Sequence, residues 1–170
     1  MNAPNDPSRI CVRKVTPADA DIVLRLVHGL AEYEKLPPPD AAAQQRLIRD
    51  MFSTPPRIEV YLGEYGGLPV GYAFVFETYS SFLALPTLYL EDVFVLPEYR
   101  NKKIGFTLFT AMVKEAHQRG CGRMEWTVLD WNRLAIDFYN HLGARHMKEW
   151  QLFRLGQEDM ERILNGAELS

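Results

Sequence analysis

Apolar and polar residues follow two different periods along this chain, and each change of period marks an expected element. Alternating or short apolar runs predict strands over 9–15, 57–64, 70–78, 87–96, 123–129 and 145–155. A helical spacing predicts helices over 17–35, 41–51, 104–119, 133–141 and 158–164. The order begins with strands joined as a hairpin and continues with strands that alternate with helices. This order predicts an α/β fold in which a mixed sheet is covered on both faces.

The expected ends of these elements carry residue types that favour starts and turns. Thr16, Pro17 and Asp19 are typical of a helix start, because threonine caps free N–H groups and proline fits the first turn. Asp40 takes the capping position before the second helix, after three prolines that end the first. The pair Gly66-Gly67 predicts a tight hairpin turn between the second and third strands.

Length and composition fit one domain, expected over residues 9–170 after a mobile tail at 1–8. A net charge of −3 provides no basic field, which argues against nucleic acid as a partner. No apolar run approaches the length of a membrane span, and the first residues lack a leader with an apolar core. With two distant cysteines, these features favour the cytoplasm. The four histidines lack the spacing of metal ligands, so no metal site is predicted.

Residues 87–105 carry most of the candidate chemistry. An apolar strand holds two adjacent carboxylates, Glu91 and Asp92, and a basic loop then opens onto an amphipathic helix. A strand, a short loop and a helix N-terminus together bind phosphate groups, because free backbone N–H groups and the positive end of the helix dipole meet there. The expected ligand is a cofactor that bears a pyrophosphate. A solvated helix start is the alternative that the loop by itself leaves open.

The loop Arg100-Asn-Lys-Lys-Ile-Gly105 resembles the Arg/Gln-x-x-Gly-x-Gly/Ala loop of the GNAT superfamily of N-acetyltransferases, which holds the pyrophosphate of acetyl-CoA. Four further segments are similar to its diamine (spermidine/spermine) and thialysine branch: Tyr89–Asp92, Leu129–Asn132, Phe138-Tyr139 and Leu142–Ala144. The resemblance covers about residues 10–155. It implies the GNAT fold, with a mostly antiparallel mixed sheet and helices on both faces, and acetyl-CoA as co-substrate.

The loop departs from the branch at two positions. The branch often carries Arg-Gly-x-Gly-x-Gly, whereas Asn101 and Lys103 replace its first two glycines here and Gly105 keeps the third. Asparagine tolerates a left-handed backbone better than most residues, and lysine does not. We therefore expect either a different loop shape or phosphate binding that depends more on side-chain charge.

The resemblance also implies which residues contact the cofactor. They lie in the strand before the loop, in the loop and helix start, and in a later helix. They are Val93, Phe94, Val95, Arg100, Asn101, Lys102, Lys103, Ile104, Gly105, Phe106, Asn132 and Ala135. For Lys102 two alternatives stay open: its side chain points to solvent or to the cofactor's 3′-phosphate. Asn132 also suits the N-cap of its helix.

Acetyl transfer to an amine needs a group that accepts a proton and a group that donates one. A lysine-like amine, with a pKa near ~10.4, is mostly protonated at neutral pH and must lose a proton before it attacks. Glu91 is the leading candidate for this role, through a water chain; in an alternating strand it would face away from Asp92. The alternative is that each acid pairs with a neighbouring cation. Tyr139 matches the tyrosine that protonates the departing thiolate in the family, with helix packing as its alternative.

The resemblance implies that Tyr33, Glu34 and Glu149 line the amine channel with Glu91 and Asp92. Serines at 80–81, where polyamine acetylases tend to carry another acid, favour a short acceptor. The predicted activity is direct N-acetylation of a diamine, a polyamine or a thialysine- or lysine-like amino acid. Two alternatives are a CoA-binding sensor or scaffold without turnover and a protein or peptide N-acetyltransferase. The family also implies a homodimer, for which the apolar run 82–85 offers a contact patch.

Overall fold

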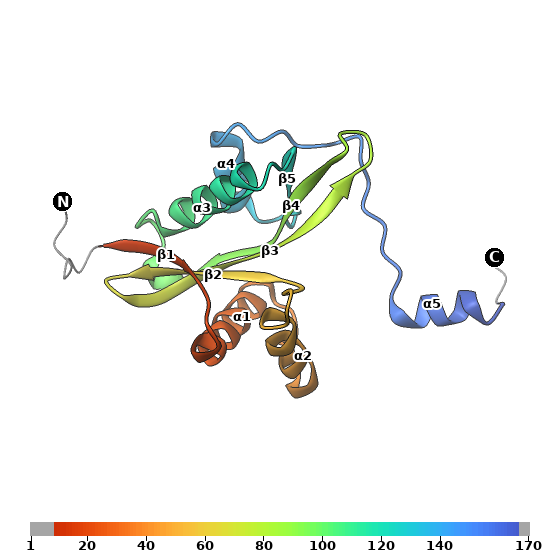
Figure 1. The fold of residues 1–170 in the computed structure, drawn as a ribbon, viewed down its shortest axis with the longest axis horizontal. Helices are drawn as coiled ribbons and strands as arrows, with labels where there is room; N and C mark the ends of the chain where they lie inside the picture. The colour runs from red at the N-terminus through yellow and green to blue at the C-terminus, as the bar shows by residue number, and fades with distance from the viewer. Residues whose placement is uncertain (1–8, 167–170) are drawn as a thin grey trace. The chain divides into compact units, whose positions relative to one another are not determined.

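A computed structural model describes residues 9–166, and the chain divides into two compact units that meet in sequence between Thr127 and Val128. The first unit contains β1 (Ile10–Lys14), the short 3-10 helix η1 (Pro17–Asp19), α1 (Ala20–Glu34), α2 (Ala41–Met51), β2 (Glu59–Tyr65), β3 (Leu68–Ser80), β4 (Leu85–Val95), η2 (Pro97–Tyr99), α3 (Ile104–Gln118) and β5 (Arg123–Glu125). The second contains α4 (Arg133–His141) and α5 (Gln157–Leu164) (Figure 1). The predicted tail at 1–8 lies outside the described residues, and one domain over 9–170 stays a prediction.

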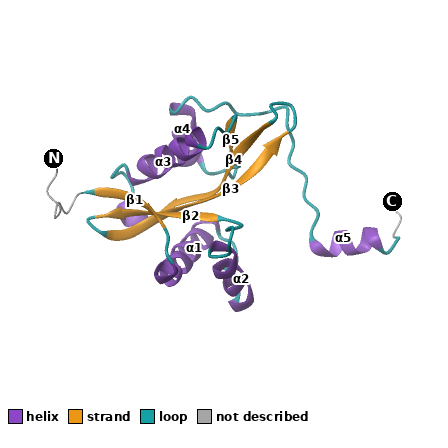
Figure 2. Cartoon of the chain, viewed as in Figure 1, coloured by secondary structure: helices purple, strands orange, loops and turns teal. Residues whose placement is uncertain are grey.

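The five strands of the first unit form one sheet in the order β1-β2-β3-β4-β5 (Figure 2). The first four pair antiparallel, and β5 pairs parallel to β4. The parallel pair requires a crossover, which α3 provides between the two strands. The observed sheet confirms the predicted α/β class with its mostly antiparallel mixed sheet.

Helices cover both faces of this sheet, with α1 and α2 on one side and α3 on the other (Figure 1). The face toward α1 and α2 holds a buried apolar cluster of Val23, Leu26, Met51, Val60, Leu62, Tyr72, Phe74 and Phe94. On the opposite face α3 approaches the sheet closely at Gly63, where an added Cβ would lie 2.9 Å from Leu108 Cδ1. Glycine therefore allows α3 to pack against β2.

The predicted helix start at residues 16–19 forms a 3-10 turn that leads into α1. The backbone N–H of Thr16 donates to Asp19 Oδ2 at 2.8 Å. The Arg13 guanidinium donates to both oxygens of the same carboxylate, each at 2.8 Å. These bonds hold the pKa of Asp19 well below its usual range. Asp40 caps α2 as predicted, since its Oδ1 accepts the N–H of Ala43 at 2.7 Å.

Two predicted strands differ from the structure. The strand expected over 123–129 is limited to Arg123–Glu125, and the strand expected over 145–155 is wrong, since no residue of that segment pairs in the described structure. Large apolar side chains in that segment are exposed, among them Trp150 and Phe153. A sequence pattern favours an extended chain, but a strand forms only where another strand offers its backbone groups.

Candidate active site

The loop before α3 adopts the left-handed backbone at both positions where glycine was replaced. Asn101 has φ of 62° and Lys103 has φ of 64°. A left-handed conformation costs roughly 1–2 kcal/mol for a residue with a Cβ, and asparagine is among the residues that tolerate it best. Of the two alternatives that the missing glycines left open, a different loop shape is not observed at these two positions. The loop keeps the positive φ angles that glycine favours. The conformational free-energy cost falls mainly on Lys103, because asparagine tolerates this backbone better.

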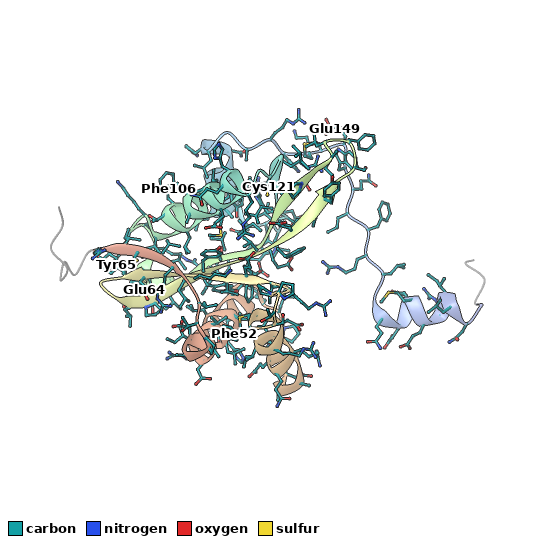
Figure 3. The ribbon with its side chains drawn as sticks, in the orientation of Figure 1. Phe52, Glu64, Tyr65, Phe106, Cys121 and Glu149 are labelled. Carbon is teal, nitrogen blue, oxygen red and sulfur yellow. The ribbon has the colours of Figure 1, made fainter. Side chains whose placement is uncertain are left out.

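The first turn of α3 offers backbone N–H groups. The first bond of the helix runs from the N–H of Thr107 to the carbonyl of Lys103 at 2.9 Å, so the N–H groups of Ile104, Gly105 and Phe106 precede the helical pattern. An added Cβ at Gly105 would meet only Val95 Cγ2, at an ordinary 3.8 Å. Packing within the chain thus does not require glycine there, although close approach of a phosphate would. Phe106, in the same turn, is 48% exposed (Figure 3).

Two of the three loop cations lie against aromatic rings of the same unit. The Nε–H of Arg100 donates to the carbonyl of Val95 at 3.2 Å, and its guanidinium carbon lies 4.4 Å from the centre of the Tyr33 ring. Lys102 Nζ lies 4.7 Å from the centre of the Tyr65 ring. Both contacts are cation–π interactions, which fix the loop to α1 and to the β2–β3 hairpin. Lys102 is exposed to solvent as well, so its stacking on Tyr65 leaves both of its predicted positions, solvent and the 3′-phosphate, open. Lys103, at the start of α3, is exposed and has no cation–π contact among those of the described residues.

The strand that precedes the loop contains a β-bulge at the predicted catalytic acid. Asp92 pairs with Phe74, whereas the next pair along the ladder joins Leu90 to Val75, so Glu91 is the extra residue. The strict alternation that would send Glu91 and Asp92 to opposite faces is therefore interrupted here. Glu91 is exposed and Asp92 is half-buried.

The edge of β4 that pairs with β5 has no strand partner after Tyr89 in the described structure. Strand β5 pairs with β4 only from Thr87 to Tyr89, and β4 continues to Val95. Within the described residues, positions 90–95 therefore have no ladder partner on that edge, although the carbonyl of Val95 accepts the Arg100 bond. Backbone groups of an unpaired strand edge can pair with an extended ligand. The side chain of Phe94 is buried in the core, so only its backbone is available to such a ligand.

Asp92 interacts with a tyrosine and with two other carboxylates, Glu91 and Glu34. The hydroxyl of Tyr72 donates to Asp92 Oδ2 at 3.2 Å. Burial raises the pKa of Asp92 to about 6, with a further increase from the negative charges of Glu91 and Glu34 and a partial offset from the Tyr72 bond. Burial also raises the pKa of Glu34, at the end of α1. The predicted substrate residues Glu34, Glu91 and Asp92 are thus close enough to interact.

The remaining predicted residues belong to the second unit. Asn132 caps α4, because its Oδ1 accepts the N–H of Ala135 at 3.2 Å. Tyr139 lies on α4 with its ring centre 5.4 Å from that of Phe138. Burial raises the pKa of Tyr139 to about 12. Glu149 lies in the segment that forms no strand, and its side chain is exposed (Figure 3).

The sequence did not single out Tyr72 as part of this region. It lies in a run of apolar residues, Val70–Val75, where a tyrosine is indistinguishable from a core aromatic. Its partnership with Asp92 depends on the register of β3 and β4 across the bulge. A register of this kind is set by pairing and not by a local signal.

Comparison with known proteins gives consistent matches. Residues 26–144 match the family model described as Acetyltransferase (GNAT) family. A thialysine N-epsilon-acetyltransferase from Sus scrofa is 33% identical, over 91% of this chain and 96% of that protein. An L-ornithine N5-acetyltransferase from Arabidopsis thaliana is 30% identical, over 89% of this chain and 86% of that protein.

A solved structure supports the fold. An integron cassette protein from V. cholerae superposes with a TM-score of 0.76 at 20% identity, over 92% of this chain and 98% of that one. At this identity the likeness concerns the fold alone. No helix among residues 9–166 is both long and apolar enough to cross a membrane.

Proposed function

Because this chain belongs to the acetyltransferase (GNAT) family, we propose that it moves the acetyl group of acetyl-CoA directly to a primary amine of a small molecule. The acceptor class is a diamine, a polyamine or a thialysine- or lysine-like amino acid. Relatives named for thialysine and L-ornithine support this class. The observation that carries the proposal is the gathering of Glu34, Glu91 and Asp92 on the unit whose β4 leads into the loop before α3.

The residues of the first unit fit the phosphate and thioester arm of the co-substrate, which supplies an acetyl group activated as a thioester. The N–H groups at 104–106, the space above Gly105 and the charge of Lys103 suit a pyrophosphate. Asn101 and Lys102 contribute the backbone of the same loop. The backbone of Val93, Phe94 and Val95 suits the pantetheine arm, because that edge of β4 has no strand partner in the described structure. Arg100 acts mainly by fixing the loop, since its guanidinium contacts Tyr33.

The two carboxylates of β4 take different roles in handling the amine. Asp92, with a pKa of about 6, is mostly ionised at neutral pH and attracts a protonated amine. Glu91, exposed on the bulge, accepts the amine's proton through water so that the nitrogen lone pair can form the new C–N bond. Tyr33, Glu34 and Glu149 contribute to acceptor binding in this proposal.

Tyr139 donates the proton that the sulfur takes up as the C–S bond breaks. With a pKa of about 12 it remains protonated throughout the working pH range. This pKa is about 3.5 above that of a thiol, near ~8.5. Transfer of the proton from the phenol to the thiolate is therefore uphill by about 5 kcal/mol. A separate proton transfer would therefore be costly, and we propose that transfer is concerted with C–S cleavage. Asn132 and Ala135, at the start of the same helix, complete the proposed cofactor contacts.

A turnover screen tests the proposed function. Purified protein with acetyl-CoA is assayed for thiol release against thialysine, L-ornithine, 1,3-diaminopropane, spermidine and a lysine-containing peptide, with mass spectrometry of the products. We expect acetylation of at least one small amine with kcat/KM well above that for the peptide. Turnover of the peptide alone, or of no acceptor, would contradict the proposal.

A further inference from the structure

Tyr72 combines a core ring with a hydroxyl that reaches an acid of the site. The side chain is 0% exposed. Its ring packs edge-on against Phe74 at 5.2 Å between centres and tilted against Phe94 at 6.3 Å. A phenylalanine would fill the same space without needing a hydrogen-bond partner. The hydroxyl instead donates to Asp92 Oδ2, so the tyrosine satisfies its own polar group by fixing a carboxylate.

The groups that face Asp92 are neutral or acidic. Tyr72 approaches from β3, Glu91 from the same strand and Glu34 from α1. Among the described residues, no lysine or arginine forms an ion pair with Asp92, and the guanidinium of Arg100 lies on the Tyr33 and Phe94 rings. A half-buried carboxylate among other carboxylates favours a cation from outside the chain.

We propose that Tyr72 is a positioning residue of the acceptor site, whose hydroxyl holds Asp92 Oδ2 and so leaves Oδ1 to bind the protonated amine. This inference rests on the proposed function, since the amine is the acceptor named there. Tyr72 touches neither reacting atom and acts through Asp92. Its ring sets where the hydroxyl lies, and the hydroxyl sets the orientation of the carboxylate.

The same bond makes amine binding depend on pH. A hydrogen bond to the ionised carboxylate lowers its pKa, which burial and the neighbouring acids raise to about 6. Loss of the hydroxyl therefore raises the pKa of Asp92 further, and more of the carboxyl is protonated between pH 6 and 7. A protonated carboxyl does not attract an ammonium group, so acceptor binding weakens most in that range and less at pH 8.5.

The experiment compares Tyr72→Phe with Tyr61→Phe. Tyr61, on the adjacent strand β2, is also buried, but its hydroxyl accepts a bond from Arg119 at 3.2 Å and lies near Glu59 and Glu115 and not near Asp92. Two measurements are made on each protein. The first is the titration midpoint of the Asp92 carboxyl carbon by NMR without ligands. The second is KM and kcat for thialysine and L-ornithine from pH 6 to 8.5.

We expect Tyr72→Phe to raise the Asp92 midpoint and to raise KM roughly 5- to 10-fold at pH 6.5, as for the loss of a typical hydrogen bond, with kcat nearly unchanged. Tyr61→Phe should leave both quantities at their wild-type values. In an Asp92→Asn background, Tyr72→Phe should add little to the change in KM, because Tyr72 acts through that carboxylate.

The outcomes separate the two proposals. An unchanged Asp92 midpoint in Tyr72→Phe, or equal shifts in both tyrosine variants, overturns the role of Tyr72. A full additional KM change in the Asp92→Asn background overturns it as well. A wild-type protein that acetylates none of the amines contradicts the proposed function, and the ligand-free titration still decides the coupling of Tyr72 to Asp92.

Discussion

Tyr139 shows how surroundings change the chemistry of one residue. Burial raises its pKa to about 12, so the phenol is a weaker acid than a free tyrosine. A group this weak is not ionised at any ordinary assay pH. Its proposed role therefore depends on placement against a sulfur that gains charge during the reaction, and not on ready dissociation.

Replacing Tyr139 with phenylalanine should lower kcat by roughly 10²–10⁴, the range for loss of a general acid, while acetyl-CoA affinity stays at the wild-type value. The wild-type rate should show no alkaline fall caused by Tyr139 below pH 10, because its pKa is about 12. Steady-state kinetics and calorimetry on the same preparation check both statements. Phe138→Leu, beside it on α4, is the control for packing. A nearly normal kcat in Tyr139→Phe would reduce the tyrosine to a packing residue.

Lys103 carries most of the backbone cost of the loop before α3. Its φ of 64° is a conformation that glycine adopts without a Cβ penalty. Lys103→Gly should raise the free energy of unfolding by about 1 kcal/mol. Removing the Cβ relieves the strain of the left-handed backbone, and this gain exceeds the extra conformational entropy that glycine loses on folding. Lys103→Ala keeps the Cβ and should not stabilise the protein. Chemical denaturation of both variants checks this, and equal stabilities would indicate that the loop is not strained at this residue.

The loop as an element should bind acetyl-CoA through charge as well as backbone. Lys103→Ala should weaken binding measured by calorimetry, and wild-type affinity should fall as salt rises. Arg100→Ala with Lys103→Ala should weaken binding further, because Arg100 also fixes the loop against Tyr33. Lys114→Ala, in the exposed middle of α3, is the matched control. Unchanged affinity in the double variant would place the cofactor elsewhere.

The start of α1 depends on an ion pair whose stability contribution varies with pH. Asp19 has a lowered pKa, so its contribution is present above the pKa of an unfolded aspartate, near ~3.9, and is lost as pH falls through the lower folded value. Asp19→Asn should cost roughly 1–3 kcal/mol at pH 7, reduced from a fully buried pair because Arg13 is 37% exposed. Thermal unfolding at pH 7 and pH 3 checks this. A cost that is as large at pH 3 would rule out the ionic contribution.

At the scale of the whole molecule, we propose a homodimer. The turn between β3 and β4 exposes an apolar surface, with Phe82 97% exposed and Leu83 and Leu85 partly so. A contiguous apolar patch of this kind favours a protein contact. Sedimentation at micromolar concentration should give a dimer, and Phe82→Ser should shift it toward monomer. A wild-type monomer would contradict the proposal.

The sequence determined the elements whose signals are local. The helix start at 16–19, the cap at Asp40 and the glycine turn at 66–67 were predicted from a few neighbouring residues, because each depends on backbone groups within one turn. The mixed sheet followed from the order of these elements, and its mostly antiparallel pairing was implied by the family resemblance. The candidate loop before α3 was predicted in the same way, from one strand, a few residues and a helix.

Tertiary structure decided what depends on pairing between distant segments. The bulge at Glu91, the bond from Tyr72 to Asp92 and the stacking of Arg100 on Tyr33 each join residues from different elements or depend on strand register. The predicted strand at 145–155 does not form, because no other strand pairs with it in the described structure. A sequence period indicates which residues can be extended or helical, and only the assembled fold supplies the groups that they contact.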